Sequence, residues 1–393
     1  MVRQIKRCFD HDPVNRGRQR ELDIAKGLIV IRMAISHSIE ILGWFLAPET
    51  GGFTWHDFDM MIKDTVPVFL LCMGISMCYS KKQTSGELLR RALTMGRVVL
   101  LLELFRTVIP CFLEWVIFRD FESINYRYQV VCVDVLQFAT LALFVMALFK
   151  RCGLSRKVML IIAALCSVAG QLLSGVTTGS VAGDMAAGFL WHSYYAAYFP
   201  LLSWLIVPVL GYVTGYAWLR LRDKETFFRW VTPIGLVFVL LYYGTMALAG
   251  EWYYFSGGNF CSINLIDVAF VYVVFFVVLG ICHYLDKWVP FVAGYFRSMG
   301  SRLNSVYCIH WTIYAFLYLF LLCVVGDNYV PDWLVIPVAL AVVVVADLLS
   351  RLYKSFVAKR RAAAVSAVSA AATDAADAAA SVPAPSSDDT KPA

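Results

Sequence analysis

The residues whose types and spacing could do chemistry begin in one long apolar stretch, residues 20–42. His37 and Glu40 lie three residues apart in it, so a helix would place both side chains on one face. An imidazole exchanges protons near neutral pH, and a neighbouring carboxylate can orient its ring. Arg32 lies in the same stretch and could bind an anion or pair with an acid from another span. Because an ionisable group at bilayer depth costs about 2.5–3.5 kcal/mol, these side chains predict a protein-lined or wet interior around this helix.

Two later apolar stretches also carry ionisable residues. Asp64 precedes Pro67 by three residues and could either cap a helix there or take part in catalysis. Glu103 and Arg106 are three residues apart, so they could pair with each other on one helix face. Asp64 is therefore a candidate site residue, whereas Glu103 and Arg106 are interpreted as a structural pair.

Further polar residues are candidates for holding an acceptor. Asp134 and Gln137 share one face of a predicted helix, where they could bind a substrate or hold two spans together. His310 lies between Tyr307 and Trp311 in a late apolar stretch. Trp55, in the loop after the first stretch, could stack on a sugar face or belong to an interfacial aromatic belt.

The composition places these residues in a membrane protein. Of the 393 residues, 60% are hydrophobic and 16% are charged, and the mean hydropathy is +0.67. Soluble domains carry about 25% charged residues. The net charge of +6 therefore reflects the sidedness of the loops, and we expect no nucleic-acid partner. The eleven cysteines form no Cys-x-x-Cys pair, and there is no His-x-x-x-His pair, Walker loop or dinucleotide fingerprint, so neither a metal site nor an ATP-driven pump is predicted.

The pattern predicts an all-α polytopic protein with about ten transmembrane helices, each long enough to cross the bilayer. The predicted spans are 24–46, 61–80, 93–117, 128–149, 157–175, 198–219, 231–250, 264–284, 303–325 and 332–352. Lys and Arg gather in alternate connections and in the exit 351–361, whereas the opposite connections hold only Lys63, Arg119 and Arg127. The positive-inside rule then places both termini in the cytoplasm of a multi-pass cell-membrane protein.

Three regions follow from this division. Residues 1–23 form a basic cytoplasmic N-terminus, residues 24–352 the membrane domain, and residues 353–393 a cytoplasmic tail that is first basic and then rich in Ala, Pro and Ser. The tail lacks large apolar residues, so we expect it to be disordered or at most a fraying helix.

Five stretches, in order along the chain, resemble a known family. Residues 20–37 (Arg20-Glu-Leu-Asp-Ile-Ala-Lys-Gly, then Met33 and His37) resemble the opening helix of the transmembrane acyltransferase superfamily, which includes the acyltransferase 3 branch. The other four resemble helices of the heparan-α-glucosaminide N-acetyltransferase branch. They are Asp64-Thr-Val-Pro-Val-Phe-Leu-Leu-Cys-Met-Gly-Ile-Ser, Val133-Asp-Val-Leu-Gln, Tyr198-Phe-Pro-Leu-Leu-Ser-Trp with Gly211, and Ser305-Val-Tyr-Cys-Ile-His-Trp.

The resemblance implies an enzyme that takes an acyl group, usually acetyl, from cytoplasmic acyl-CoA and passes it to an acceptor across the membrane. In the heparan branch the acceptor is a glucosamine amine, and a histidine in the loop after the first span takes part. Here the His-x-x-Trp-x-Gly spacing of that loop is replaced by Trp55-His56, so the acceptor is not carried over. We expect a hydroxyl or amine of a glycan or glycolipid, and leave a homodimer open.

The roles follow from this chemistry. We expect His37 as general base with Glu40 beside it, His56 as the alternative base or an acceptor contact, and Asp64 at the catalytic site. Direct transfer and an acyl-histidine intermediate are both open. Cations at the cytoplasmic mouth would hold the CoA phosphates, and polar and aromatic groups would hold the acceptor. The predicted cofactor contacts are Arg20, Lys26 and Arg32, and the predicted acceptor contacts are Asp134, Gln137, His310 and Trp55. The alternative is a permease or a lipid or saccharide flippase without acyl transfer.

Overall fold

The computed structural model describes residues 2–42, 66–80, 83–119, 132–248, 260–326 and 330–380. In these ranges the chain is helical, and its one β-contact is an isolated bridge between Phe9 and Leu221. The all-α class predicted from the sequence is confirmed over this part of the chain. The helices are α1 (Val2–Arg7), α2 (Arg20–Leu42), α4 (Val66–Tyr79), α5 (Ser85–Glu103), η2 (Leu104–Val108), α6 (Ile109–Phe118), α8 (Val135–Arg151), α9 (Arg156–Leu172), α10 (Val181–Ala187), α11 (Leu201–Trp204), α12 (Ile206–Trp218), α13 (Lys224–Leu248), α14 (Leu265–Trp288), α15 (Pro290–Gly300), α16 (Leu303–Val324) and α17 (Asp332–Ala380).

Each predicted span overlaps a helix or a continuous run of helices. Within the described residues, five helical runs are long and apolar enough to cross a membrane: Leu201–Trp218, Lys224–Leu248, Leu265–Trp288, Leu303–Val324 and Trp333–Ser366. These runs support a multi-pass membrane protein. Helix α2 is not one of the five, because its sequence carries several charged residues. The count of ten spans and the side on which the termini lie stay predictions.

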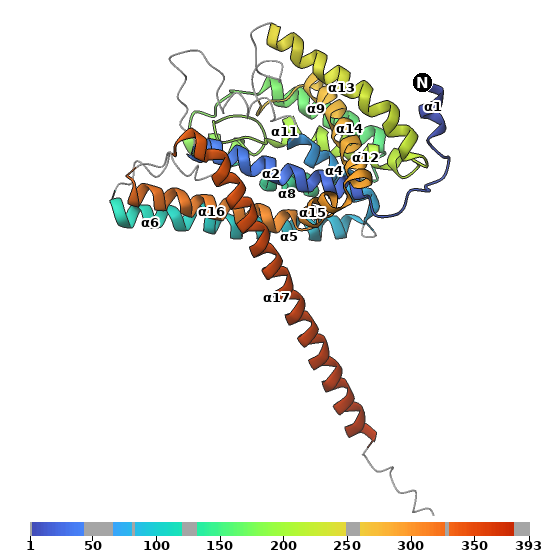
Figure 1. The fold of residues 1–393 in the computed structure, drawn as a ribbon. Helices are drawn as coiled ribbons and strands as arrows, with labels where there is room; N and C mark the ends of the chain where they lie inside the picture. Colours follow the sequence, from blue (N-terminus) through green and yellow to red (C-terminus); the bar gives the residue numbers. More distant parts are fainter. Residues whose placement is uncertain are drawn as a thin grey trace, which may run out of the picture.

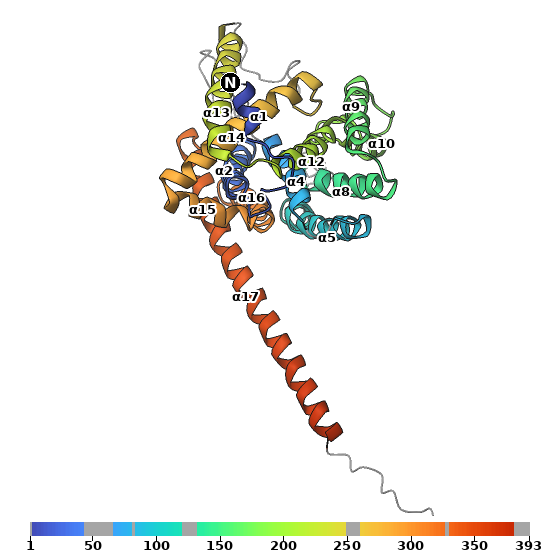
Figure 2. The same cartoon turned by 90° about the vertical axis from the view of Figure 1, so that its right-hand side faces the viewer.

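Helix α2 lies at the centre of the molecule. It packs against α4, α14, α15, α16 and α17, and Figures 1 and 2 show these helices around it, with α5, α8 and α9 further out on the α4 side. Two glycines let α2 and α15 approach closely. A Cβ on Gly27 would lie 2.1 Å from the carbonyl oxygen of Phe296, and one on Gly300 would lie 2.0 Å from that of Asp23. Helix α2 is thereby packed directly against the backbone of α15.

The helical run that starts at Ser85 is interrupted by a π-helical turn at residues 104–108. Thr84 caps α5 with a capping box to Glu87. The chain then passes through the π-helical turn η2 and continues as α6. Such turns often occur at functional positions, since the extra residue redirects a side chain. Here the turn carries Arg106, which is buried.

The C-terminal helix α17 begins in the body of the molecule, where it packs on α2 and α16, and then extends away from it to Ala380 (Figure 1). Arg302, before α16, anchors it by donating to Asp347 over 2.7 Å. Alanine has the highest helix propensity, which accounts for helix in the Ala-rich tail; residues 381–393 lie outside the described residues. The division of the chain into three regions stays a prediction.

Candidate active site and cationic cavity

Two histidines from distant parts of the chain stack on each other in the interior of the protein. Nδ1 of His37, on α2, lies 3.4 Å from a carboxylate oxygen of Glu40. The ring of His37 lies 5.4 Å from that of His310 on α16, with 19° between their planes. It also lies 4.1 Å from the ring of Trp311. If Glu40 accepts from Nδ1–H, then Nε2 of His37 carries the lone pair, as in the histidine of a catalytic triad.

His310 is fully buried, and the backbone sets its tautomer. Nδ1 of His310 lies 3.2 Å from the carbonyl oxygen of Val306, which can only accept, so Nδ1 carries the proton. The other ring nitrogen, Nε2, then has a lone pair, and it has no hydrogen-bond partner among the described residues. Two imidazoles, one paired with a carboxylate and one holding an unused acceptor atom, therefore lie side by side.

A buried guanidinium connects this histidine cluster to two carboxylates. Arg106 donates to Glu103 over 2.6 Å and to Asp134 over 3.4 Å. Its guanidinium carbon lies 4.8 Å from the centroid of the Trp311 ring. The hydroxyl of Tyr307 donates to the same carboxylate oxygen of Asp134. This chain of contacts joins η2, α8 and α16 and fixes both aromatic neighbours of His37.

Gln137 belongs to the same network. Its Nε2 donates to Glu103, whereas its buried Oε1 has no partner in the described part of the chain. Asp134 is also the N-cap of α8, with its side chain 2.6 Å from the backbone nitrogen of Val135. The helix start thus fixes the positions of both side chains. A buried acceptor left unpaired costs about 1–3 kcal/mol, so Oε1 of Gln137 and Nε2 of His310 favour a ligand that carries N–H or O–H groups.

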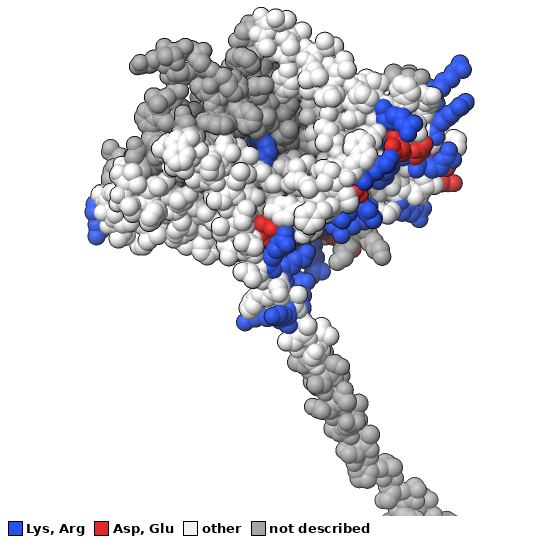
Figure 3. Space-filling view, viewed as in Figure 1, with Lys and Arg blue, Asp and Glu red and all other residues white. Residues whose placement is uncertain are grey.

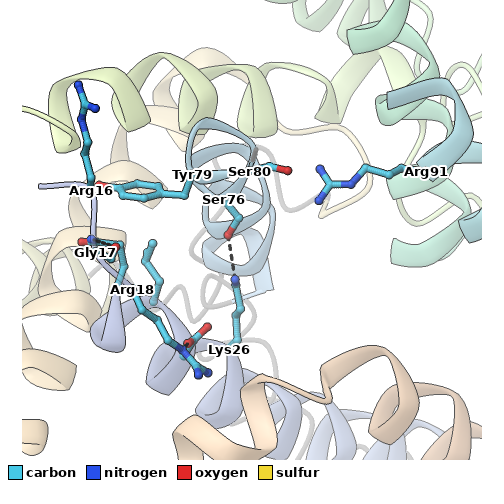
Figure 4. A pocket seen from close by; sticks show the side chains of 11 residues that line it. Arg16, Gly17, Arg18, Lys26, Ser76, Tyr79, Ser80 and Arg91 are labelled. Atoms are coloured by element: carbon cyan, nitrogen blue, oxygen red, sulfur yellow. Dashed lines mark hydrogen bonds and ion pairs between the residues drawn. The ribbon is translucent and has the colours of Figure 1, made fainter. Parts of the chain in front are cut away.

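A cationic cavity of about 400 Å³ lies beside the first turns of α2. Figure 4 shows Lys26 and Ser76 hydrogen-bonded across it, with the arginines of the N-terminal segment on one side and Arg91 on another. Lys26 Nζ donates to Ser76 over 2.9 Å. The buried hydroxyl of Tyr79 has no partner within the described ranges. The lining residues are Arg16, Gly17, Arg18, Gln19, Leu22, Asp23, Lys26, Ser76, Tyr79, Ser80 and Arg91.

The cavity and the histidine cluster share helix α2. Lys26 and His37 are eleven positions apart, which corresponds to about 16 Å along a helix axis. The two groups therefore lie about three helical turns apart along the same helix.

Comparison with known protein families identifies the family of the chain. The family model described as heparan-alpha-glucosaminide N-acetyltransferase, catalytic, matches residues 18–257, which is more than half of the chain. The chain belongs to this family. No curated protein matches it, and no solved structure matches it. The resemblance inferred from the five motifs is thereby confirmed, and it makes the protein a membrane acetyltransferase by family.

The match begins just before α2 and includes most of the candidate site of this family member. It contains His37, Arg106 and Asp134, but it ends before α16, which supplies Tyr307 and His310. Residue 16 also lies outside the match, although it lines the cavity.

Of the three predicted cofactor contacts, only one lines the cavity. Arg20 is largely exposed and pairs with Asp286 at 3.5 Å, away from the cavity lining. Arg32 is half-buried on α2 and does not line the cavity either. Lys26 does line it. Their roles in cofactor binding stay predictions. His56, Trp55 and Asp64 lie outside the described residues.

The predicted pair of Glu103 and Arg106 is confirmed by their 2.6 Å contact. The link from this pair to Asp134 and to the ring of Trp311 was not predicted. Nor was the cavity lining by Arg16, Arg18 and Arg91, because basic residues at a membrane's cytoplasmic side are expected for sidedness alone. The sequence contains no local signal that separates these arginines from the other basic residues of the N-terminus and of α5.

Proposed function

We propose that this protein transfers an acyl group, most often acetyl, from acyl-CoA on the cytoplasmic side to an amine or hydroxyl of a sugar-like acceptor. The observation that carries the proposal is that α2 holds both a cation of the cavity, Lys26, and the His37–Glu40 pair. The cavity suits the phosphates of CoA, because it is lined by four basic side chains and one acidic one. The thioester end would extend along α2 toward the histidines. Arg32 lies between these two positions, and its contribution to acyl-CoA binding is part of the proposal.

The chemistry needs a base and little else. A thioester is already activated, so the acceptor N–H or O–H must lose its proton as its nitrogen or oxygen attacks the carbonyl carbon. Nε2 of His37 takes this proton, and Glu40 stabilises the resulting imidazolium. The tetrahedral intermediate then expels the CoA thiolate, which takes the proton from the His37 imidazolium and leaves as CoA thiol. A positioned base contributes about 10²–10⁴-fold to such a step.

The acceptor is held by the unused polar atoms of the cluster. Oε1 of Gln137 and Nε2 of His310 can both accept hydrogen bonds. The hydroxyl and amine groups of a sugar would donate hydrogen bonds to these two acceptor atoms. Asp134 holds Tyr307 in place beside His310, whose ring centroid lies 5.2 Å from that of Tyr307. His56, Trp55 and Asp64 are proposed to complete the acceptor side.

The deciding experiment uses purified full-length protein with acetyl-labelled acetyl-CoA and an amino sugar. We expect labelled acetyl on the sugar and free CoA in equal amounts. In sealed vesicles, uptake of an intact labelled sugar without acetyl-CoA would instead favour the permease or flippase alternative, since an acyltransferase moves only the acyl group.

Removal of the Lys26 charge should weaken cofactor binding. Lys26→Gln is expected to raise the Kd for CoA by at least about tenfold, because a charge-assisted contact contributes about 1.5–3 kcal/mol. The matched control is Lys354→Gln, which removes one charge from an exposed position on α17. Equal CoA affinity of both variants in a titration would place the phosphates elsewhere.

We further propose that both termini are cytoplasmic. Figure 3 shows Lys and Arg gathered over the end of the molecule near α1 and around the point where α17 leaves the body. Two reporters are fused after Arg361, one that is active only in the cytoplasm and one that is active only outside it. We expect activity from the first reporter alone. Activity of an extracytoplasmic reporter at that position would contradict the ten-span arrangement.

A further inference from the structure

The N-terminal segment Cys8–Gln19, called the strap below, is fixed to the connection between α12 and α13. The backbone nitrogen of Asp10 donates to the carbonyl of Arg220 over 2.8 Å, and that of Asn15 donates to the carbonyl of Leu219 over 2.8 Å. Phe9 and Leu221 form an antiparallel bridge between the first of these hydrogen bonds and a third one, in which the backbone nitrogen of Arg222 donates to the carbonyl of Cys8 over 2.8 Å. The strap is therefore held by backbone pairing as well as by side chains.

Side chains lock the end of the strap that meets α2. Oε1 of buried Gln19 accepts from the indole nitrogen of Trp218 over 2.9 Å and from Lys224 Nζ over 2.7 Å. Lys224 also pairs with buried Glu21 at 2.6 Å. Because the strap is fixed in this way, Arg16, Gly17 and Arg18 have defined positions in the wall of the cavity.

The two arginines of the strap, Arg16 and Arg18, differ in whether a carboxylate is paired with them. Arg18 is already paired with Asp23 at 2.7 Å. Arg16 donates through Nε to the carbonyl of Pro13 over 2.9 Å, and no ion pair to it is found among the described residues. Its two terminal nitrogens are therefore available to a ligand. A guanidinium matches the geometry of a phosphate oxygen pair better than an ammonium does.

The position of the strap determines which part of a ligand it can contact. It precedes the first turn of α2, whereas His37 lies toward the opposite end of the same helix. If the acyl end of acyl-CoA reaches His37, the nucleotide end lies toward the strap. The nucleotide end carries a phosphomonoester on its ribose. This group has more negative charge and more free oxygens than either phosphate of the pyrophosphate bridge.

We propose that Arg16 contacts the ribose phosphomonoester of CoA and so lets this protein discriminate CoA from dephospho-CoA. The inference rests on the proposed function, since it takes the cavity as the site of the CoA nucleotide. It concerns a residue that the family match, residues 18–257, does not include. The buried hydroxyl of Tyr79, on helix α4, is a second group with which this end of the ligand would form a hydrogen bond.

The test compares two ligands on one variant. Purified wild-type protein is expected to bind CoA about tenfold more tightly than dephospho-CoA, a difference of about 1.4 kcal/mol. In Arg16→Gln the ratio should fall to about twofold or less, because only CoA loses a contact. The Kd for dephospho-CoA should stay unchanged. Arg7→Gln, an equal charge change at an exposed position of α1 that does not line the cavity, should keep the wild-type ratio.

Each other outcome has a definite meaning. If Arg16→Gln keeps the wild-type ratio, or weakens both ligands equally, Arg16 does not contact the phosphomonoester and the inference is overturned while the proposed function stands. A wild-type protein that binds both ligands equally also overturns it. If the wild-type protein binds neither ligand, the cavity is not a CoA site and the proposed function fails with it.

Discussion

Replacing His37 with alanine is expected to lower turnover by at least about 100-fold, with the Kd for acyl-CoA little changed. The loss falls on turnover because the imidazole takes the proton of the attacking acceptor and does not hold the CoA phosphates, which would bind near Lys26. The measurement is initial rate with labelled acetyl-CoA and a saturating sugar acceptor, together with a CoA titration of the same variant.

Two further variants separate the base from its neighbours. Glu40→Gln keeps the shape but removes the charge beside Nδ1 of His37, so turnover should fall less than in His37→Ala. His56→Ala should act mainly on the KM for the acceptor. Near-normal turnover in His37→Ala, with complete loss in His56→Ala, would assign the base to the loop histidine and remove His37 from catalysis.

The second large effect is expected on stability. Arg106→Leu should lower the free energy of unfolding by about 3–5 kcal/mol, because it leaves the carboxylates of Glu103 and Asp134 without their buried partner. Arg106→Lys keeps the charge but cannot donate to both carboxylates in the same geometry, so it should be intermediate. The midpoint of thermal unfolding in one detergent, measured for all variants, gives the order.

Arg90→Gln is the matched control for this series. Arg90 lies on α5 in the same continuous helical run, but it is exposed, so its replacement should change stability by less than about 0.5 kcal/mol. If Arg106→Leu were as stable as this control, the two carboxylates would have to be protonated or solvated in the native protein, and the network would not hold the helices together.

The sequence alone determined the helical membrane class and the positions of most helices. Apolar runs of sufficient length leave few other structures, because backbone groups in lipid must pair within the segment. It also predicted pairs within one helical run, such as His37 with Glu40 and Glu103 with Arg106, since residues three apart in a helix lie close together on its surface. The order of the five motifs indicated the family.

Only the tertiary structure decided which of these local pairs meet. The stacking of His37 on His310 depends on how α2 and α16 cross, and the contact of Arg106 with Asp134 depends on the π-helical turn in η2. The same holds for Arg16, which reaches the cavity because backbone pairing fixes the strap to the α12–α13 connection. Contacts of this kind arise from the packing of whole helices, in which each crossing angle depends on many side chains at once, so no single stretch of sequence specifies them.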